Sequence, residues 1–448
     1  MVFNSKQIFI LESSEIKAMS NGKDIYLWIK EAFPIKRTLA GPGFDETLNL
    51  IKKKLPELII HEYKSGSKVF DWKVPPEWHL EEGYIKNSKG EKIIDSNKSS
   101  LHILGYSEPI NKILNLEELS KNIYTLENLP EAIPYVASFY DSNWGFCMSH
   151  NQFLSLNEDE YEVVIKAKKI NGVLKTGEFF KKGATKKEII FSTYICHPEM
   201  VNNELAAPAI MVHLAEMLAK KETKYSYRFL FNVETIGTLC YINKNMKNLK
   251  DNVLAGFVLT CFGDSSEPNL IPSRYGNSVA DSFANETLEK LNINFNKRTY
   301  FDKGSEERQY THPNIDLPFV TITRSLFREY KEYHTSLDNL DIVSPESLDS
   351  SYKLIESLIK HIESEPIYIS STIGEPFLSK RNLYAQISFI TKSTELHKEL
   401  STKLVNLSAY CDGKNTVSDL YKLLPYSQDV IDDLITISLE HNLISEIA

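Results

Sequence analysis

Long apolar runs are missing from this sequence of 448 residues. No stretch approaches the roughly 18 consecutive apolar residues that a membrane-spanning helix needs, so we expect no membrane partner. An excess of positive charge is also missing, since the formal net charge is −9. Nucleic-acid-binding surfaces usually carry a basic patch or stripe, and the acidic balance argues against such binding as the main function.

Cysteine is scarce as well. The five cysteines are odd in number, scattered, and mostly inside apolar runs, at Cys147, Cys196, Cys240, Cys261 and Cys411. This pattern favours buried thiols in a reducing compartment over a disulfide framework or a thiolate zinc site. The first ten residues are too short and too broken to form a signal peptide. We therefore expect a cytoplasmic protein.

The remaining composition is that of an ordinary globular protein, with 42% apolar and 25% charged residues. Its length predicts two or three domains. Residues 14–62 predict two helices, residues 63–110 contain short β-branched and aromatic runs between turn residues, and residues 112–131 again predict a helix. We therefore expect an α/β domain made of residues 1–63 and 126–367, with a small β-rich domain inserted at residues 64–125.

The middle of the chain alternates between strand and helix patterns. Strands are predicted at 161–166, 188–196, 227–233, 254–261 and 318–323, and helices at 205–220, 236–245 and 345–363. Such alternation is typical of a doubly wound, mostly parallel sheet with helices on both faces.

The last part of the chain has a different pattern. Three helices are predicted at 397–407, 416–424 and 427–442, with a turn at Asp412-Gly-Lys-Asn415. This pattern fits a winged-helix-like module over residues 368–448. Because nothing in it is strongly basic, we expect it to contact a protein partner or a second copy of the chain rather than DNA.

Polar residues stand at the ends of several predicted strands. These are His197 with Glu204, then Glu234, Asp264, and His334 with Asp338. Binding sites in open parallel sheets form outside the carboxyl ends of the strands. Imidazole and carboxylate groups are the ligands of catalytic zinc, which keeps one position open for water. Each residue alone is equally compatible with a loop histidine, a helix-capping acid or a turn aspartate, and only their coincidence at one edge predicts a metal site.

Several motifs carry a family resemblance. They are Asp71-Trp-Lys-Val-Pro-Pro-Glu-Trp78, Trp144-Gly-Phe-Cys147, Cys196-His-Pro-Glu199, Asn202-Asn-Glu-Leu205, Gly304-Ser-Glu-Glu-Arg-Gln-Tyr310 and Glu332-Tyr-His-Thr-Ser-Leu-Asp-Asn-Leu340. In these motifs the chain resembles bacterial aminopeptidase-like domain proteins that are often associated with surface polysaccharide biosynthesis. More distantly, it resembles zinc aminopeptidases of the leucyl-aminopeptidase and glutamate-carboxypeptidase type. The resemblance covers the chain to about residue 365 and extends more faintly beyond it.

The resemblance implies a zinc-exopeptidase-like α/β fold with a doubly wound mixed sheet. It implies zinc ligands among His197, Glu204, Asp264 and His334, with Glu234 as the general base. Three positions depart from the di-zinc pattern, because Asn203, Thr235 and Thr260 stand where those enzymes have acids. We therefore expect one zinc ion rather than two.

The segment Gly304–Arg308 is a candidate for substrate binding. Glu307 would meet a substrate amine and Arg308 a carboxylate, while Arg324 and Tyr333 would line the same cleft. An ordinary charged surface loop is the alternative. The sequence thus predicts a zinc-dependent amide hydrolase of the aminopeptidase type that acts on a small peptide or amide. A deacylase of an N-acylated sugar or small conjugate, and a scaffold protein that kept the fold without the reaction, remain open.

Overall fold

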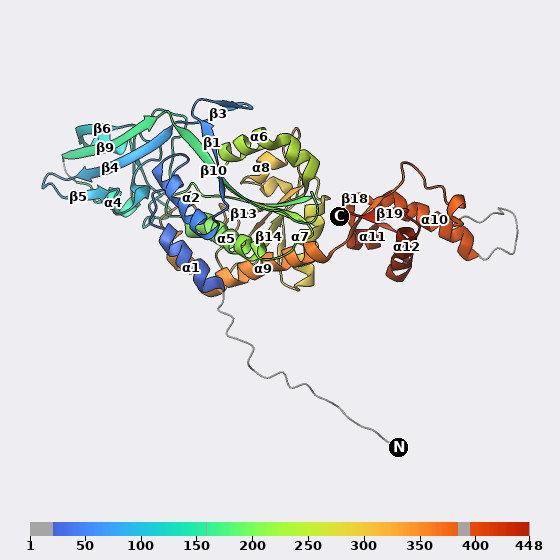
Figure 1. Ribbon diagram of the computed structural model, residues 1–448. Helices are drawn as coiled ribbons and strands as arrows, with labels where there is room; N and C mark the ends of the chain where they lie inside the picture. Colours follow the sequence, from blue (N-terminus) through green and yellow to red (C-terminus); the bar gives the residue numbers. More distant parts are fainter. Residues whose placement is uncertain (1–20, 158, 384–394, 448) are drawn as a thin grey trace, which may run out of the picture.

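The computed structural model describes residues 21–157, 159–383 and 395–447. The N-terminal residues on which the signal-peptide argument depends therefore lie outside the described part. Figure 1 shows a central α/β body with a smaller β-sheet at one end and the C-terminal helices at the other. Within the described residues, none of the helices has the length and apolar character that crossing a bilayer requires.

The body is built on an eight-stranded mixed sheet with the order β1-β10-β12-β11-β13-β16-β14-β15. Its strands are β1 (Ile59–Lys64), β10 (Val173–Lys181), β11 (Glu188–Tyr194), β12 (Ser226–Asn232), β13 (Val253–Leu259), β14 (Asn269–Ile271), β15 (Asn296–Lys297) and β16 (Phe319–Thr323). The four central strands, β12, β11, β13 and β16, run parallel to one another. They correspond to four predicted strands, and the large mixed sheet of the expected fold class is confirmed.

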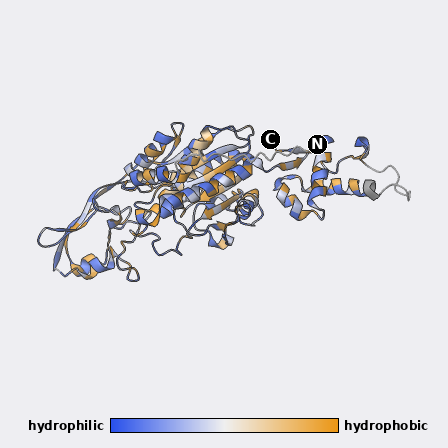
Figure 2. Ribbon diagram, turned by 90° about the horizontal axis from the view of Figure 1, so that it is seen from below, coloured by the Kyte–Doolittle hydropathy of each residue, from blue (hydrophilic) through white to orange (hydrophobic). Residues whose placement is uncertain are grey.

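Helices cover both faces of this sheet. Figure 1 shows α6 (Ile236–Asn252) and α8 (Glu307–Tyr310) on one face. The other face carries α1 (Asn21–Ala32), α2 (Pro42–Lys54), α5 (Ala206–Ala219), α7 (Val279–Lys290) and α9 (Pro345–Ser364). Every residue of β11 and β12 is buried between these layers. Figure 2 shows the resulting concentration of apolar residues along the central strands and the inner sides of the helices.

A second sheet of four strands, in the order β5-β4-β9-β6, forms one end of the molecule. It consists of β4 (Glu77–Lys86), β5 (Lys92–Asp95), β6 (Ile110–Asn115) and β9 (Glu160–Ile170). Three of its strands come from the segment 64–125, whereas β9 comes from outside it. Only Asn171 and Gly172 separate β9 from β10 of the central sheet. The division into domains at the boundaries given above stays a prediction.

The prediction of a helix at 112–131 is wrong. The structure has β6 up to Asn115, a short helix α3 (Leu116–Ser120) and then β7 (Ile123–Tyr124). All six residues of β6 pair with β9, so cross-strand pairing overrides the local helical pattern. Only α3 is helical in this segment, and the Asn115 side chain caps it by accepting a hydrogen bond from the Glu118 N–H. The remaining short elements are β2 (Lys68–Val69), β3 (Trp72–Lys73), β8 (Phe146–Cys147) and α4 (His150–Leu154).

The C-terminal part has its own apolar cluster, which includes Leu404, Leu407, Leu420 and Ile431. The three predicted helices are present as α10 (Glu395–Tyr410), α11 (Val417–Leu423) and α12 (Gln428–Glu440). They pack with a three-stranded sheet of β17 (Ile367–Ser370), β18 (Asp412–Thr416) and β19 (Ile444–Glu446). That this arrangement is a winged-helix module stays a prediction.

A buried carboxyl group joins the segment 304–310 to the sheet. Glu306 is fully buried and forms 2.5 Å hydrogen bonds with the hydroxyls of Ser192 on β11 and Thr238 on α6. Within the described residues no cation pairs with it. Burial raises the pKa of Glu306 from 4.5 to about 8, the nearby Glu234 adds to this rise, and the two hydroxyls oppose it. At neutral pH Glu306 is therefore a neutral acid that holds the start of α8 against β11 and α6.

This protonation state predicts a pH-dependent stability. The unfolded chain releases the Glu306 proton near pH 4.5, whereas the folded protein keeps it until about pH 8. Stability is therefore lost as pH rises through this window, at about 1.4 kcal/mol per pH unit for one whole proton. Glu306→Gln keeps a neutral side chain of the same shape, so its unfolding free energy should fall less between pH 5 and pH 7. Urea titrations of both proteins at each pH measure the difference, and parallel pH curves would contradict the assignment.

Candidate functional site

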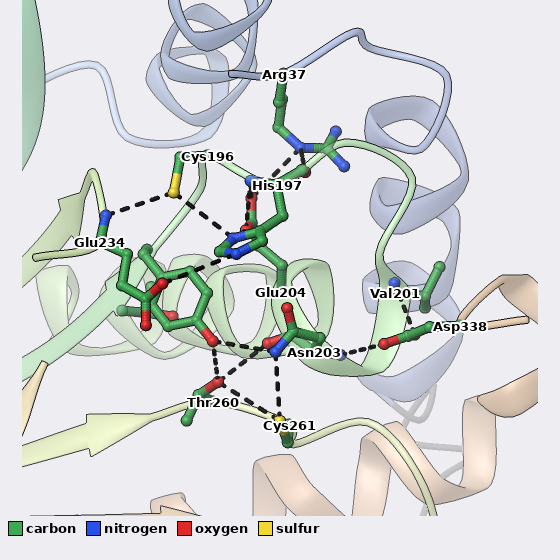
Figure 3. A network of polar contacts seen from close by, with 12 residues as sticks. Arg37, Cys196, His197, Val201, Asn203, Glu204, Glu234, Thr260, Cys261 and Asp338 are labelled. Atoms are coloured by element: carbon green, nitrogen blue, oxygen red, sulfur yellow. Dashed lines mark hydrogen bonds and ion pairs between the residues drawn. The ribbon is translucent and has the colours of Figure 1, made fainter. Parts of the chain in front are cut away.

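The candidate site lies where β11, β12 and β13 end. Beyond their last residues the chain continues into Cys196 and His197, into Glu234, and into Thr260 and Cys261 (Figure 3). The loop that follows β16 brings His334 to the same edge. Non-glycine residues with positive φ gather here, namely Glu199 (51°), Thr235 (64°), Cys261 (47°) and His334 (55°). Such backbone strain concentrates at functional sites, where the surrounding structure holds it in place.

The imidazole of His197 is held from one side by Glu204. The Glu204 carboxylate accepts hydrogen bonds from the His197 backbone N–H at 2.6–2.7 Å and lies 2.5 Å from Nδ1. Arg37 reinforces this arrangement, because its Nε donates to the His197 carbonyl at 2.8 Å and lies 3.5 Å from Glu204 Oε1. The side chains of Arg37 and Glu204 are fully buried. The position and the ring orientation of His197 are therefore fixed from behind.

Glu204 lies in a π-helical turn, Val201–Leu205, that precedes α5. Turns of this kind are frequent at functional sites. Asp338 stabilises the turn from another loop, because its carboxylate accepts the backbone N–H groups of Val201, Asn202 and Asn203 at 2.6–3.0 Å. Burial raises the pKa of Asp338 to about 6, although these N–H groups oppose the rise. Asp338 thus ties the loop that carries His334 to the turn that carries Glu204.

The other side of the His197 ring faces the remaining site residues. Nε2 lies 3.8 Å from Glu234 Oε2, and the centroids of the His197 and His334 rings are 5.1 Å apart. Tyr333 stacks on His334 at 3.9 Å, and Tyr135 contacts both imidazoles edge-on at 5.1 and 5.3 Å. Arg308 Nη2 lies 3.9 Å from Glu234 Oε1. The structure therefore brings His197, Glu204, Glu234, His334, Tyr333 and Arg308 together.

The pKa values of the groups near Nε2 of His197 decide which of them can accept a proton or bind a cation. Burial lowers the pKa of His334 to about 2, and His197 and Arg328 contribute, so this imidazole is neutral. Burial raises the pKa of Glu234, while His197 and Arg308 oppose the rise. Burial also lowers the pKa of His197, but Cys196 and the Glu204 carboxylate outweigh it and raise the pKa well above 6.5. A cation bound at Nε2 would take the place of the proton that the raised pKa keeps on the His197 ring.

The two sides of the His197 ring offer a metal ion different groups. Among the described residues Asn203 Oδ1 is buried without a hydrogen-bond partner, within the network of Figure 3, and on the Nε2 side Glu234 Oε2 lies 3.8 Å from Nε2. On the Nδ1 side, Cys196, His197 and Glu204 place ligand atoms within 4.8 Å of one another. There, however, burial raises the pKa of the Cys196 thiol to about 11, and Glu204 is already bonded to His197. In a metal-bound histidine, the ring nitrogen that does not bind the metal commonly contacts a carboxylate, as Nδ1 of His197 contacts Glu204.

Three predicted site residues have other partners. Asp264 accepts hydrogen bonds from Asn202 Nδ2 at 2.9 Å and from the Ser325 hydroxyl. Glu307 accepts from the backbone N–H groups of Gly304 and Ser305, and Arg324 donates to the hydroxyls of Ser350 and Ser351. Among the described residues, no hydrogen bond or ion pair joins Asp264, Glu307 or Arg324 to His197, Glu234 or His334.

Sequence reasoning missed Arg37 and Tyr135. Arg37 lies 160 positions from the carbonyl it binds, and its surroundings in the sequence carry no motif. Tyr135 is held through its backbone N–H, which donates to the His334 carbonyl at 2.8 Å. A contact of either kind leaves no local pattern in the chain.

Comparisons with known proteins agree with this architecture. A Clostridium acetobutylicum protein, whose name couples polysaccharide biosynthesis with an aminopeptidase-like domain, is 37% identical over 431 residues, which are 94% of this chain and 96% of that protein. The crystal structure of a candidate peptidase from the same organism is 36% identical, covers 95% of this chain and 96% of its own, and gives a TM-score of 0.78.

A zinc aminopeptidase from Bacillus subtilis is similar in fold only. It is 12% identical, covers 76% of this chain and 94% of its own, and gives a TM-score of 0.56. The model of the family described as a domain of unknown function, DUF4910, matches residues 26–365. This match spans most of the chain and includes each of the site residues above. The protein therefore belongs to the DUF4910 family, and the 37% identical relative carries an aminopeptidase-like domain in its name.

Proposed function

We propose that the protein is a zinc-dependent amide hydrolase of the aminopeptidase type. One observation carries this proposal, namely the convergence of His197 Nε2, Glu234 and His334 at the carboxyl edge of the parallel strands, with Nδ1 of His197 already bonded to Glu204. The aminopeptidase-like domain in the name of the 37% identical relative supports the same activity class.

His197 and His334 are the proposed zinc ligands. When bound, zinc lowers the pKa of water to about 7 and polarises the carbonyl of the scissile amide. Glu204 supports His197 from behind, and Asp264 remains a less favoured ligand because Asn202 and Ser325 already occupy its carboxylate. Asn203, Thr235 and Thr260 provide no acid for a second ion, so the proposal has one zinc ion.

Glu234 is the proposed general base. Its carboxylate takes a proton from the attacking water, whose oxygen forms a bond to the amide carbon, and then delivers the proton to the leaving amine as the C–N bond breaks. Arg308 lies 3.9 Å from Glu234 and would hold an acidic group of the substrate, while Tyr333 lines the cleft beside His334. These positions suit a small peptide or a similar amide.

A second candidate uses the same chemistry. The name of the relative refers to polysaccharide biosynthesis, which favours a deacylase of an N-acylated sugar or small conjugate. The bond that breaks is again an amide, so the roles of His197, His334 and Glu234 do not change. A scaffold protein is the alternative from a different class, and the absence of acids at Asn203 and Thr235 is the observation that favours it. The C-terminal module would then act as the contact for a protein partner or a second copy.

The ligand assignment predicts the metal content of three variants. His197→Ala and His334→Ala should each lower bound zinc at least about tenfold, since changes even in outer partners of metal ligands commonly cost 10–100-fold. His312→Ala removes an exposed imidazole and should leave the zinc content unchanged. Equilibrium dialysis against zinc followed by elemental analysis measures all three. Because His334 is neutral and no carboxylate among the described residues pairs with it, its variant should keep the fold. Full zinc occupancy in the double histidine variant would reject the site.

If Glu234 is the general base, its substitution should reduce turnover without reducing zinc binding. Glu234→Gln should keep zinc, because the base is not a ligand, and should keep the fold, because the change is nearly isosteric. Its turnover on aminoacyl or N-acyl amides should fall by about 10²–10⁴-fold, which is the usual contribution of a positioned acid–base group. Loss of zinc in this variant would instead make Glu234 a ligand. Unchanged turnover with zinc retained would remove Glu234 from the mechanism.

A further inference from the structure

A short hairpin made of β2 and β3 stands above the sheet edge at which the candidate site lies. It follows β1, whose last residue Lys64 pairs with Val173 of β10. Because Gly177 of β10 pairs with Phe231, the last but one residue of β12, Val173 lies three residues beyond the end of β12. At about 3.3 Å per residue, the hairpin starts roughly 10 Å beyond that strand end. Figure 1 shows it there, beside the end of β1 and α6.

Two exposed aromatic rings meet on this hairpin. Trp72 exposes 42% of its surface and Tyr140 exposes 55%, and their ring centroids lie 5.9 Å apart. The Tyr140 hydroxyl donates to the Lys73 carbonyl at 3.3 Å, which fixes the second ring to β3. Val69 and Val74 of the same hairpin are buried in the main apolar core. The hairpin is therefore anchored to the body of the protein, while both rings keep about half of their surface open.

The two rings border the candidate site on the side of α6. β2 contacts α6, and this helix begins two residues after Glu234. Burial raises the pKa of Tyr140, and Cys240 in the second turn of α6 adds to the rise, so Tyr140 lies near this helix. Tyr140 also follows Tyr135, which contacts the imidazoles of both proposed zinc ligands, by five positions. The rings therefore lie outside the residues that would hold the metal ion.

We propose that Trp72 and Tyr140 form an outer binding subsite that stacks a flat ring of the ligand, either an aromatic side chain or a sugar ring. Both kinds of ring present C–H groups, which the negative face of an aromatic side chain attracts. Tryptophan and tyrosine also supply a large, rigid contact area at a low cost in conformational entropy. Only the position of this ring relative to the amide rests on the proposed function. There the ring would lie beyond the bond that breaks, so the substrate would consist of more than one unit.

Ligand-observed NMR titration of the full chain tests this binding without turnover. The ring-bearing probes are phenylalaninol and methyl glucoside, and alaninol and glycerol are their counterparts without a ring. None of the four contains an amide, so failure of the proposed function would leave the result unaffected. We expect at least one ring-bearing probe to saturate and to bind at least about fivefold more tightly than its counterpart, as expected for one aromatic contact. Binding of phenylalaninol alone assigns the subsite to an aromatic side chain, and binding of methyl glucoside alone assigns it to a sugar.

Five variants locate the binding on the hairpin. Trp72→Ala and Tyr140→Ala each remove one ring and should weaken binding at least about fivefold. Trp72→Phe and Tyr140→Phe keep a ring, so the dissociation constant should stay within about twofold of the wild-type value. Phe377→Ala removes an exposed ring in the C-terminal part and should leave binding unchanged.

The proposal is overturned if neither ring-bearing probe saturates, if the counterparts bind as tightly, or if both alanine variants bind like Phe377→Ala. Equal loss of binding in Tyr140→Phe and Tyr140→Ala would also overturn it, because the hydroxyl rather than the ring would then make the contact. Thermal unfolding checks the fold of each variant. If Trp72→Ala does not fold, Tyr140→Ala decides alone, since that side chain is more than half exposed.

Discussion

The contact between Glu204 and His197 is the interaction on which the rest of the site depends. A single buried carboxylate accepts the backbone N–H of His197 and bonds to Nδ1 of its ring, and Arg37 compensates its charge. Removing one partner of a buried ion pair is strongly destabilising, so these three residues act as a unit. With Nδ1 occupied, only Nε2 can face a ligand, and Glu234 and His334 lie on that side.

The sheet makes this arrangement possible by ending its parallel strands at one edge. His197, Glu234 and Cys261 follow three neighbouring strands, and Asp338 fastens the His334 loop to the turn that carries Glu204. The carboxyl group of Glu306 secures the third side, because it joins the segment before Arg308 to β11 and α6. Each of these anchors is buried and polar, which explains why the strained residues Thr235 and His334 keep their unusual backbone conformations.

The sequence predicted the parallel core and missed contacts that span long distances along the chain. The runs that became β11, β12, β13 and β16 are rich in apolar residues that are β-branched or aromatic, and such runs are typical of the buried strands of parallel sheets. The segment 112–131 misled because its helical pattern is local, whereas the pairing of β6 with β9 is not. Strand ends also identified His197, Glu234 and His334. The strand ends could not reveal that Asn202 and Ser325 donate hydrogen bonds to the Asp264 carboxylate. They also could not reveal that Arg37 binds the His197 carbonyl from 160 positions away. Both contacts depend on the packing of distant segments.

The central claim is that His197 presents Nε2 to a metal ion while Glu204 holds Nδ1. Anomalous scattering measured on both sides of the zinc absorption edge, from crystals grown with zinc, tests it most directly. The account predicts one peak at about 2.0–2.1 Å from His197 Nε2, the usual zinc–nitrogen distance, with the Nδ1–Glu204 contact intact. A peak on the other side of the ring, between Cys196 and Glu204, would contradict it, and so would the absence of any peak near His197.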